Sequence, residues 1–201
     1  MRQTAKILRT TLEGLYDEPT VHPIYAHALR SAGTWQTVNT ALKTDTWSWK
    51  DPAPAVDEAS LGLKLSPGAS LALQPPLLRG ANGFSIQLRI REPGKPFAAG
   101  IRFDFSDKDA RYRRLVVQDP GDVVLYEGDG KEEKRVRSQP LEARLGPGQW
   151  VDIGFIAEGD DLVCYLNQRP AFILRTPLAP DRLIGLWADT ETNVRSIQVR
   201  K

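Results

Sequence analysis

Residues 84–90 read FSIQLRI and residues 99–105 read AGIRFDF, and this alternation of apolar and polar side chains decides the fold. A period of two places successive side chains on opposite faces of a β-strand. We therefore expect two strands that bury one face and expose the other. The side chains predicted to face the core are those of Phe84, Ile86, Leu88, Ile90, Ile101, Phe103 and Phe105, whereas Gln87, Arg89, Arg102 and Asp104 are predicted to face away from it.

The same pattern continues to the end of the chain. From residue 60 onward, short alternating segments such as RYRRLVVQ (111–118), WVDIGFIAEG (150–159) and VRSIQVR (194–200) are separated by glycine, proline or aspartate. Turn signals at this spacing, with no helical period between the strands, are typical of a β-sandwich rather than of a parallel sheet. We predict an all-β fold, an antiparallel β-sandwich of the jelly-roll kind spanning residues 60–201.

Three of its turns can be named. Asp129-Gly130 fits a two-residue type I′ hairpin turn. Gly159-Asp160-Asp161 is expected to join two further antiparallel strands, and residues 167–170 (NQRP) to form a tight reversal.

Residues 1–59 form a separate region in this interpretation. The apolar side chains of residues 3–16 recur at helical spacing, and a second short helix is expected from residue 23 to about residue 30. The proline-spaced stretch DPAPAVDEA (51–59) is typical of an extended connector. We predict a short N-terminal helical arm that docks either on its own sandwich or on a partner chain, because so short a helix is unstable alone.

Composition excludes several function classes. The chain has 201 residues, of which 27 are basic and 25 acidic and interspersed, so neither nucleic acid nor a membrane is expected as a partner. The single cysteine, Cys164, lies among apolar residues and is predicted to be a packed thiol. No signal peptide and no membrane-spanning run are expected, which indicates a cytoplasmic protein, although a module of a longer secreted protein has the same features.

The order of the segments resembles a known family. FSIQLRIRE, FAAGIRFDFSD, RYRRLVVQ and DVVLYEGDGK are similar to the central strands of the concanavalin A-like lectin/glucanase superfamily, and the stretch 146–172 resembles its recurring hairpin. Laminin-G-like modules and the 3-keto-disaccharide hydrolases are the most similar members, although those domains often have Asn-Gly where this chain has Asn167-Gln168. The resemblance implies two curved sheets, with a concave face that often binds carbohydrate.

One motif suggests catalysis. Glu127, Asp129 and Glu132 match the E-x-D-x-x-E spacing of family 16 glycoside hydrolases in this superfamily, where two glutamates act as nucleophile and acid/base. That chemistry needs the carboxylates on one continuous strand. Because Asp129-Gly130 is a turn signal, we expect the carboxylates to be splayed apart, and we assign no catalytic residue.

A second motif suggests calcium. Asp104, Ser106, Asp107 and Asp109 supply clustered oxygen atoms, which are the ligands that calcium prefers. Their spacing does not follow the EF-hand pattern, and neighbouring arginines offset their charge. We therefore expect no cofactor and no metal, with calcium as the weaker alternative.

The predicted ligand face combines aromatic, arginine and carboxylate side chains, a mixture suited to stacking on a sugar ring and binding its hydroxyls. The alternative is that Trp187 packs under the arm. The residues assigned to ligand binding are Arg89, Arg102, Asp104, Tyr112, Arg113, Trp187 and Asp189.

Three functions remain open on the sequence. The first is a non-catalytic module that binds carbohydrate or a protein partner through the concave face. The second is a glycoside-processing enzyme similar to the 3-keto-disaccharide hydrolases. The third is a structural or assembly subunit, possible as an oligomer, that uses the N-terminal arm.

Overall fold

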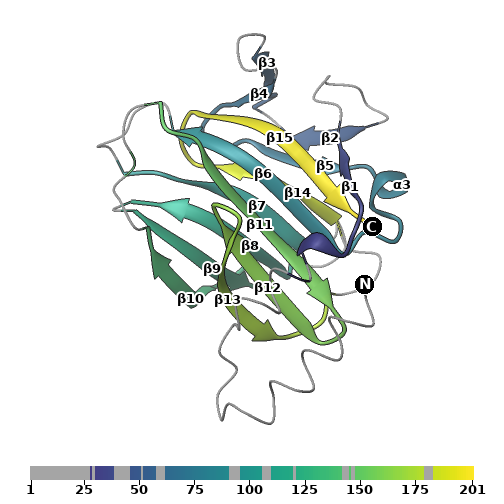
Figure 1. The fold of residues 1–201 in the computed structure, drawn as a ribbon. Helices are drawn as coiled ribbons and strands as arrows, with labels where there is room; N and C mark the ends of the chain where they lie inside the picture. Colours follow the sequence, from purple (N-terminus) through teal and green to yellow (C-terminus); the bar gives the residue numbers. More distant parts are fainter. Residues whose placement is uncertain are drawn as a thin grey trace.

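The computed structural model describes residues 28, 30–38, 46–50, 52–57, 62–90, 96–105, 110–119, 121–141, 145, 148–178 and 183–201. Over these residues the protein is a sandwich of two antiparallel β-sheets (Figure 1). The predicted all-β sandwich is therefore confirmed. The expected helix over residues 3–16 lies outside the described residues, as does most of the expected helix over residues 23–30.

Within the described residues one sheet has eight strands, all antiparallel to their neighbours. Seven of them follow in the order β13 (Arg169–Arg175), β12 (Asp161–Leu166), β11 (Val151–Glu158), β6 (Gly83–Ile90), β15 (Thr192–Arg200), β4 (Gly62–Leu65) and β3 (Ala55–Asp57). The eighth, β1 (Trp35–Thr37), pairs with the C-terminal end of β15.

The other sheet has seven strands over the same part of the chain. Their order is β10 (Glu133–Pro140), β9 (Asp122–Gly128), β8 (Tyr112–Gln118), β7 (Ala98–Phe105), β14 (Leu183–Ala188), β5 (Ser70–Leu73) and β2 (Trp47–Lys50). A single turn of helix, α3 (Pro75–Leu78), follows β5. Because β1, β2 and β3 belong to the two sheets, paired strands in the described part of the chain begin at Trp35. The sequence had suggested that the sandwich begins at residue 60.

The hydrophobic core lies between the sheets and follows the predicted alternation. Phe84, Ile86 and Leu88 of β6 are fully buried in it, opposite Ile101 and Phe103 of β7. The rings of Phe103 and Phe155 stack across the core with their centroids 4.4 Å apart. The prediction of a packed thiol is also confirmed, because Cys164 is buried in this core and burial raises its pKa.

A β-bulge at Asp104 breaks the alternation and corrects one prediction. Leu183 and Ile184 of β14 pair with Phe105 and Phe103, so Asp104 is an extra residue in β7, with a positive φ of 55°. Aspartate tolerates this left-handed backbone better than most residues. The extra residue turns the Phe105 ring to the outer face, where it lies 4.8 Å from the Arg102 guanidinium, whereas Phe105 was expected in the core.

All three predicted turns lie where the sequence placed them, and one of them differs in type. β11 and β12 reverse at Gly159 and Asp160, and β12 and β13 at Asn167 and Gln168, as expected. The β9–β10 hairpin also turns at the expected position. However, Gly128 pairs with Glu133, so the loop has four residues, 129–132, and is not a two-residue type I′ turn.

The described end of the N-terminal arm packs on the outer face of the eight-stranded sheet. Ala28 and Trp35 contact a small apolar cluster of Ile156, Val163 and Tyr165. Over these residues the arm docks on its own sandwich, on the sheet that does not contain Trp187. Among the described residues, no helix has the length and apolarity needed to span a membrane.

Candidate functional site: a groove and an arginine–aromatic face

The residues predicted to bind a ligand do not form one surface. Arg89 projects from the outer face of the eight-stranded sheet, beside Trp150, whereas Arg102 and Trp187 project from the outer face of the seven-stranded sheet. Arg89 is therefore on the opposite side of the sandwich from Arg102 and Trp187. Asp189 lies beyond the end of β14, where its carboxylate accepts a hydrogen bond from the Ala98 amide at 2.5 Å.

Tyr112 and Arg113 are neighbours in β8, and the pleat separates them. Leu115 and Val117 are in the core, so Arg113, two residues before Leu115, lies on the inner side of the sheet beyond the core's edge. Tyr112 lies on the outer face, with its ring across the backbone of Gly128. Burial first, and then the Glu133 carboxylate, raise the pKa of the Tyr112 phenol.

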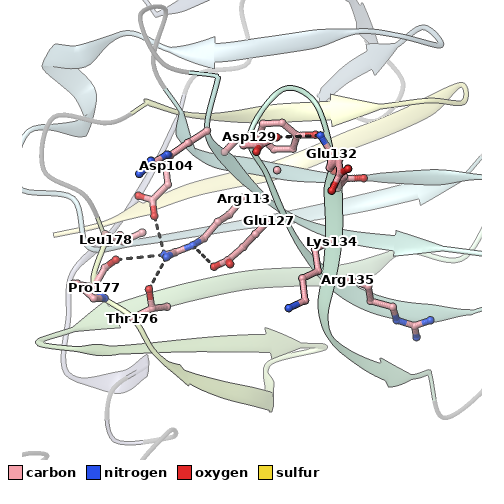
Figure 2. A pocket seen from close by; sticks show the side chains of 14 residues that line it. Asp104, Arg113, Glu127, Asp129, Glu132, Lys134, Arg135, Thr176, Pro177 and Leu178 are labelled. Atoms are coloured by element: carbon pink, nitrogen blue, oxygen red, sulfur yellow. Dashed lines mark hydrogen bonds and ion pairs between the residues drawn. The ribbon is translucent and has the colours of Figure 1, made fainter.

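Residues from both sides of the sheet line an open groove with a volume of about 1090 Å³, among them Asp104 and Arg113 on the inner side and Tyr112 on the outer face (Figure 2). Its walls come from β8, from the β9–β10 hairpin and from the segment that follows β13. The lining side chains are mostly polar or charged, and Tyr112 is its aromatic member. The charged ones are Asp104, Arg111, Arg113, Glu127, Asp129, Glu132, Glu133, Lys134 and Arg135.

Arg113 organises this groove. Its guanidinium donates hydrogen bonds to Asp104 of β7 at 2.8 Å and to Glu127 of β9 at 3.0 Å. It also donates to the Thr176 hydroxyl and to the Pro177 carbonyl, which follow β13 in the other sheet (Figure 2). The bulge at Asp104 turns that carboxylate inward, toward Arg113, so the prediction that Asp104 faces away from the core with Arg102 was wrong. Arg113 therefore ties three strands of one sheet to the end of the other.

The three carboxylates of the glucanase-like motif have separate positions. Glu127 is on β9 and is paired with Arg113, whereas Asp129 and Glu132 lie in the turn. The Asp129 carboxylate accepts hydrogen bonds from the backbone amides of Glu132 and Lys131, each at 3.0 Å, which lowers its pKa. The prediction that a turn separates these carboxylates is confirmed.

The outer face of the seven-stranded sheet carries a second cluster, which we call the arginine–aromatic face: Arg102, Phe105, Tyr112, Arg114, Tyr126 and Trp187. The Arg102 guanidinium lies 4.5 Å from the Tyr112 ring centroid and 4.8 Å from that of Phe105. The Arg114 guanidinium lies 3.8 Å from the Trp187 ring centroid. Trp187 is thus half-buried beneath an arginine of its own sheet.

Sequence reasoning did not find Arg114, Lys134 or Thr176. A signal for Arg114 was present, because Tyr112 and Arg114 are two residues apart in RYRRLVVQ and a period of two puts both on one face. Lys134 and Thr176 carry no such signal. They reach the groove only because the β9–β10 hairpin and the chain after β13 meet in space.

The expected calcium alternative is largely outside the described residues. Ser106, Asp107 and Asp109 are not described, and Asp104 is paired with Arg113. In the part of the chain that is described, no three potential metal-ligating side chains come together.

Comparison with known proteins identifies the fold. No family model matches the chain, and no curated protein matches it. Among solved structures, the carbohydrate-binding module CBM66 from Bacillus subtilis superposes with a TM-score of 0.60 at 13% identity, covering 76% of this chain and 93% of that one. The chain has the concanavalin A-like lectin/glucanase fold.

Two further structures of the concanavalin A-like fold illustrate its range. The catalytic domain of an endo-1,3-β-glucanase (laminarinase) from Thermotoga petrophila has a TM-score of 0.59 at 11% identity, over 84% of this chain and 98% of that one. The carbohydrate recognition domain of Emp46p, in a metal-free form, has a TM-score of 0.57 at 15% identity, over 83% and 97%. The concanavalin A-like fold occurs in binding and cleaving proteins alike, so function must be argued from the site.

Proposed function

We propose that this chain is a non-catalytic carbohydrate-binding module whose ligand occupies the groove beside Arg113. The observation that carries this proposal is the open groove of about 1090 Å³ at the end of the seven-stranded sheet, which is lined mainly by polar and charged residues. Pockets for drug-sized ligands span about 300–1,000 Å³, so this groove has room for more than one sugar unit.

The chemistry of the groove suits sugar hydroxyls. Hydroxyl groups both donate and accept hydrogen bonds, and the groove offers carboxylates that accept and cationic groups that donate. Arg113 already donates four hydrogen bonds to the protein, so its main role is to fix the shape of the groove. The exposed side chains of Glu132 and Lys134 are the ones best placed to bind; Lys134 and Arg135 point to opposite sides of β10 (Figure 2).

The positions and partners of the carboxylates favour a non-catalytic role. Retaining glycoside hydrolysis needs a pair about 5 Å apart, one of them free to attack the sugar. Here Glu127 is neutralised by Arg113, and Asp129 accepts backbone hydrogen bonds within its own turn. The similarity in fold to a carbohydrate-binding module and to a carbohydrate recognition domain supports the same proposal.

A glycan array followed by calorimetry with the best-binding oligosaccharide tests this function. Glu132→Gln and Lys134→Met should each weaken binding about tenfold or more, as expected for the loss of a hydrogen bond to a charged group. The matched controls are Arg137→Met, on the same strand but outside the groove, and Asp160→Asn, in a turn of the other sheet. Both controls should bind as the parent does.

Two results would contradict the proposal. If no oligosaccharide binds at millimolar concentration, the chain is not a carbohydrate-binding module. If reducing ends are released from a bound glycan and Glu127→Gln abolishes the release, the module is an enzyme and the glycoside-processing alternative is correct.

A further inference from the structure

Two arginines on the outer face of the eight-stranded sheet converge on one tryptophan. The guanidinium carbon of Arg195, on β15, lies 3.9 Å from the Trp150 ring centroid, and that of Arg89, on β6, lies 4.8 Å from it. Arg195 pairs with Gln87, two residues before Arg89 on the same face of β6. The two arginines are thus diagonal neighbours in the sheet, about 7–8 Å apart along the backbone, so both side chains can reach one ring.

Neither guanidinium is neutralised by a carboxylate. Arg89 makes no hydrogen bond or ion pair with any residue that the structure describes, and Arg195 donates only through Nε, to the Gln87 side-chain oxygen at 3.0 Å. Acidic side chains in and beside the neighbouring strands have other partners: Asp57 contacts Asn193, Asp152 contacts Arg30 and Ser85, Glu158 contacts Arg200, and Glu191 contacts Lys64. Two positive charges therefore lie close together without a paired anion.

The unused hydrogen-bond donors of this cluster face solvent. No side-chain nitrogen of Arg89, Arg195 or Gln87 is a buried atom without a partner. The nitrogens that make no hydrogen bond to the described part of the chain are therefore open to a ligand. The Gln87 oxygen accepts from Arg195 and from the exposed Ser196 hydroxyl at 3.3 Å, which leaves the amide NH₂ as the free end of that side chain. The free groups are thus two guanidinium ions and an amide, all of them donors.

We propose that Arg89, Arg195 and Gln87 bind the phosphate group of a phosphate monoester. A guanidinium offers a planar fork of donors that matches phosphate oxygens. A phosphate monoester carries a charge of about −1.5 to −2 at pH 7, which offsets two arginines, whereas a carboxylate or a sulfate ester carries a single charge. Because both guanidinium groups already stack on Trp150, less conformational freedom is lost when the phosphate binds.

This site is separate from the groove of the proposed function. None of Arg89, Arg195, Gln87 and Trp150 lines that groove, which lies at the end of the seven-stranded sheet. The inference therefore goes beyond carbohydrate binding in the groove and does not depend on it.

Side-chain NMR spectroscopy of the full chain tests the site, because it observes each arginine separately. Glucose 6-phosphate should shift the Nε–H resonances of Arg89 and Arg195 and the indole N–H resonance of Trp150 until the site is saturated. Inorganic phosphate should do the same, and the difference in affinity between the two measures what the sugar contributes. Glucose 6-sulfate should bind more weakly and glucose should cause no shift. Sodium chloride keeps the ionic strength constant, so that screening does not change during a titration.

Substitutions then assign the binding. Arg89→Gln and Arg195→Gln should each weaken the binding of glucose 6-phosphate about tenfold or more, as expected for the loss of a hydrogen-bonded charge. Arg195→Lys keeps the charge but loses the fork, so it should give an intermediate affinity, and it provides a folded variant if Arg195→Gln does not fold. Arg102→Gln is the matched control, because Arg102 also stacks on aromatic rings, at 4.5 and 4.8 Å, but on the other sheet. It should leave the affinity unchanged.

Three results would overturn the inference. The first is that glucose 6-phosphate leaves the resonances of Arg89 and Arg195 unmoved. The second is that glucose 6-sulfate binds as tightly as glucose 6-phosphate, because the site then does not select the doubly charged group. The third is that Arg102→Gln weakens binding as much as Arg89→Gln does. Failure of the groove to bind any oligosaccharide would contradict the proposed function alone, since the shifts at Arg89 and Arg195 would remain.

Discussion

The guanidinium of Arg114 covers the ring of Trp187, with 3.8 Å between the guanidinium carbon and the ring centroid. The same guanidinium donates to Glu133 at 2.7 Å through Nε and forms a second contact with that carboxylate. Arg114, on β8, therefore links β14 to β10 across the three strands that lie between them. A sugar can stack on this ring face only by displacing Arg114.

Replacing Arg114 by alanine should uncover Trp187 and destabilise the fold. We expect the free energy of unfolding to fall by about 1–3 kcal/mol, because a cation–π contact and a charge-assisted hydrogen bond are lost together. Acrylamide should quench the tryptophan fluorescence of Arg114→Ala more strongly than that of the parent. The increase should be absent in the double variant Arg114→Ala/Trp187→Phe.

Arg135→Ala is the control for that prediction. Arg135 is in the same cross-strand row, but its side chain is 48% exposed, so its ion pair with Asp122 should contribute at most about 1 kcal/mol. If the two variants lose equal stability and the quenching of Trp187 does not change, the contact between Arg114 and Trp187 has no stabilising role.

A second prediction concerns Arg113, whose side chain is only 16% exposed and donates to four residues. Arg113→Gln should lower the free energy of unfolding by about 2–4 kcal/mol, because it leaves the Asp104 carboxylate partly buried without its cation. Urea denaturation measures this loss. Arg113→Lys should recover little, since a single ammonium cannot reproduce the fork.

A double-mutant cycle checks the mechanism of that loss. If the cation of Arg113 stabilises the fold through Asp104, the double variant Asp104→Asn/Arg113→Gln should lose less free energy of unfolding than the two single variants lose together. Additive losses would show that the Asp104–Arg113 pair at 2.8 Å is not coupled energetically.

The two arginines at the centre of the predicted site show what the sequence could and could not reveal. Arg89 in FSIQLRI and Arg102 in AGIRFDF have the same local pattern, and each lies outside the core as predicted. Alternation distinguishes the inside of a sandwich from the outside. It does not distinguish the two outer faces, which depend on strand pairing between residues far apart in sequence.

For a related reason, the sequence pattern did not reveal the bulge at Asp104 or the short strands β1, β2 and β3. A bulge is a property of a strand pair, here β7 with β14, so AGIRFDF alone gives no sign that Phe105 changes face. Three or four residues are too few to show a period, and those strands form by pairing with neighbouring strands at the edges and ends of the sheets. The groove likewise depends on segments that meet only in the folded chain.

A third prediction concerns the turn between β12 and β13, where Asn167 and Gln168 have φ values of 47° and 66°. The left-handed region costs a residue other than glycine about 1–2 kcal/mol. Gln168→Gly removes that cost and adds a smaller entropic penalty in the unfolded chain. We expect a net gain of about 0.5–1 kcal/mol, seen as a rise in Tm of about 1–4 °C.

Asp160→Gly is its matched control. Asp160 occupies the second position of the turn between β11 and β12, but its φ is not positive. There the glycine brings only the entropic cost, so Tm should fall slightly. A fall in Tm for Gln168→Gly as well would mean that the side chain of Gln168 contributes more than its backbone strain removes.

The last prediction concerns pH and Asp152 of β11. Burial raises the pKa of this carboxyl, and the effect outweighs the Arg30 guanidinium at 3.8 Å and the hydrogen bond from Ser85. Because the folded pKa is higher than the unfolded value of about 3.9, the folded state binds the proton more tightly. Between these two values the folded state carries more protons, so the free energy of unfolding falls as pH rises.

Asp152→Asn has no such proton to lose, and its amide oxygen can still accept the hydrogen bond from Ser85. The free energy of unfolding of Asp152→Asn, relative to that of the parent, should therefore increase as pH rises from the pKa of Asp152 in the unfolded chain toward neutrality. Urea titrations at a series of pH values measure this difference. Asp160→Asn, in an exposed turn, is the matched control for the change from carboxyl to amide. If the parent instead becomes more stable relative to Asp152→Asn as pH rises, the ion pair with Arg30 outweighs burial. The carboxylate then stabilises the described end of the N-terminal arm on the eight-stranded sheet.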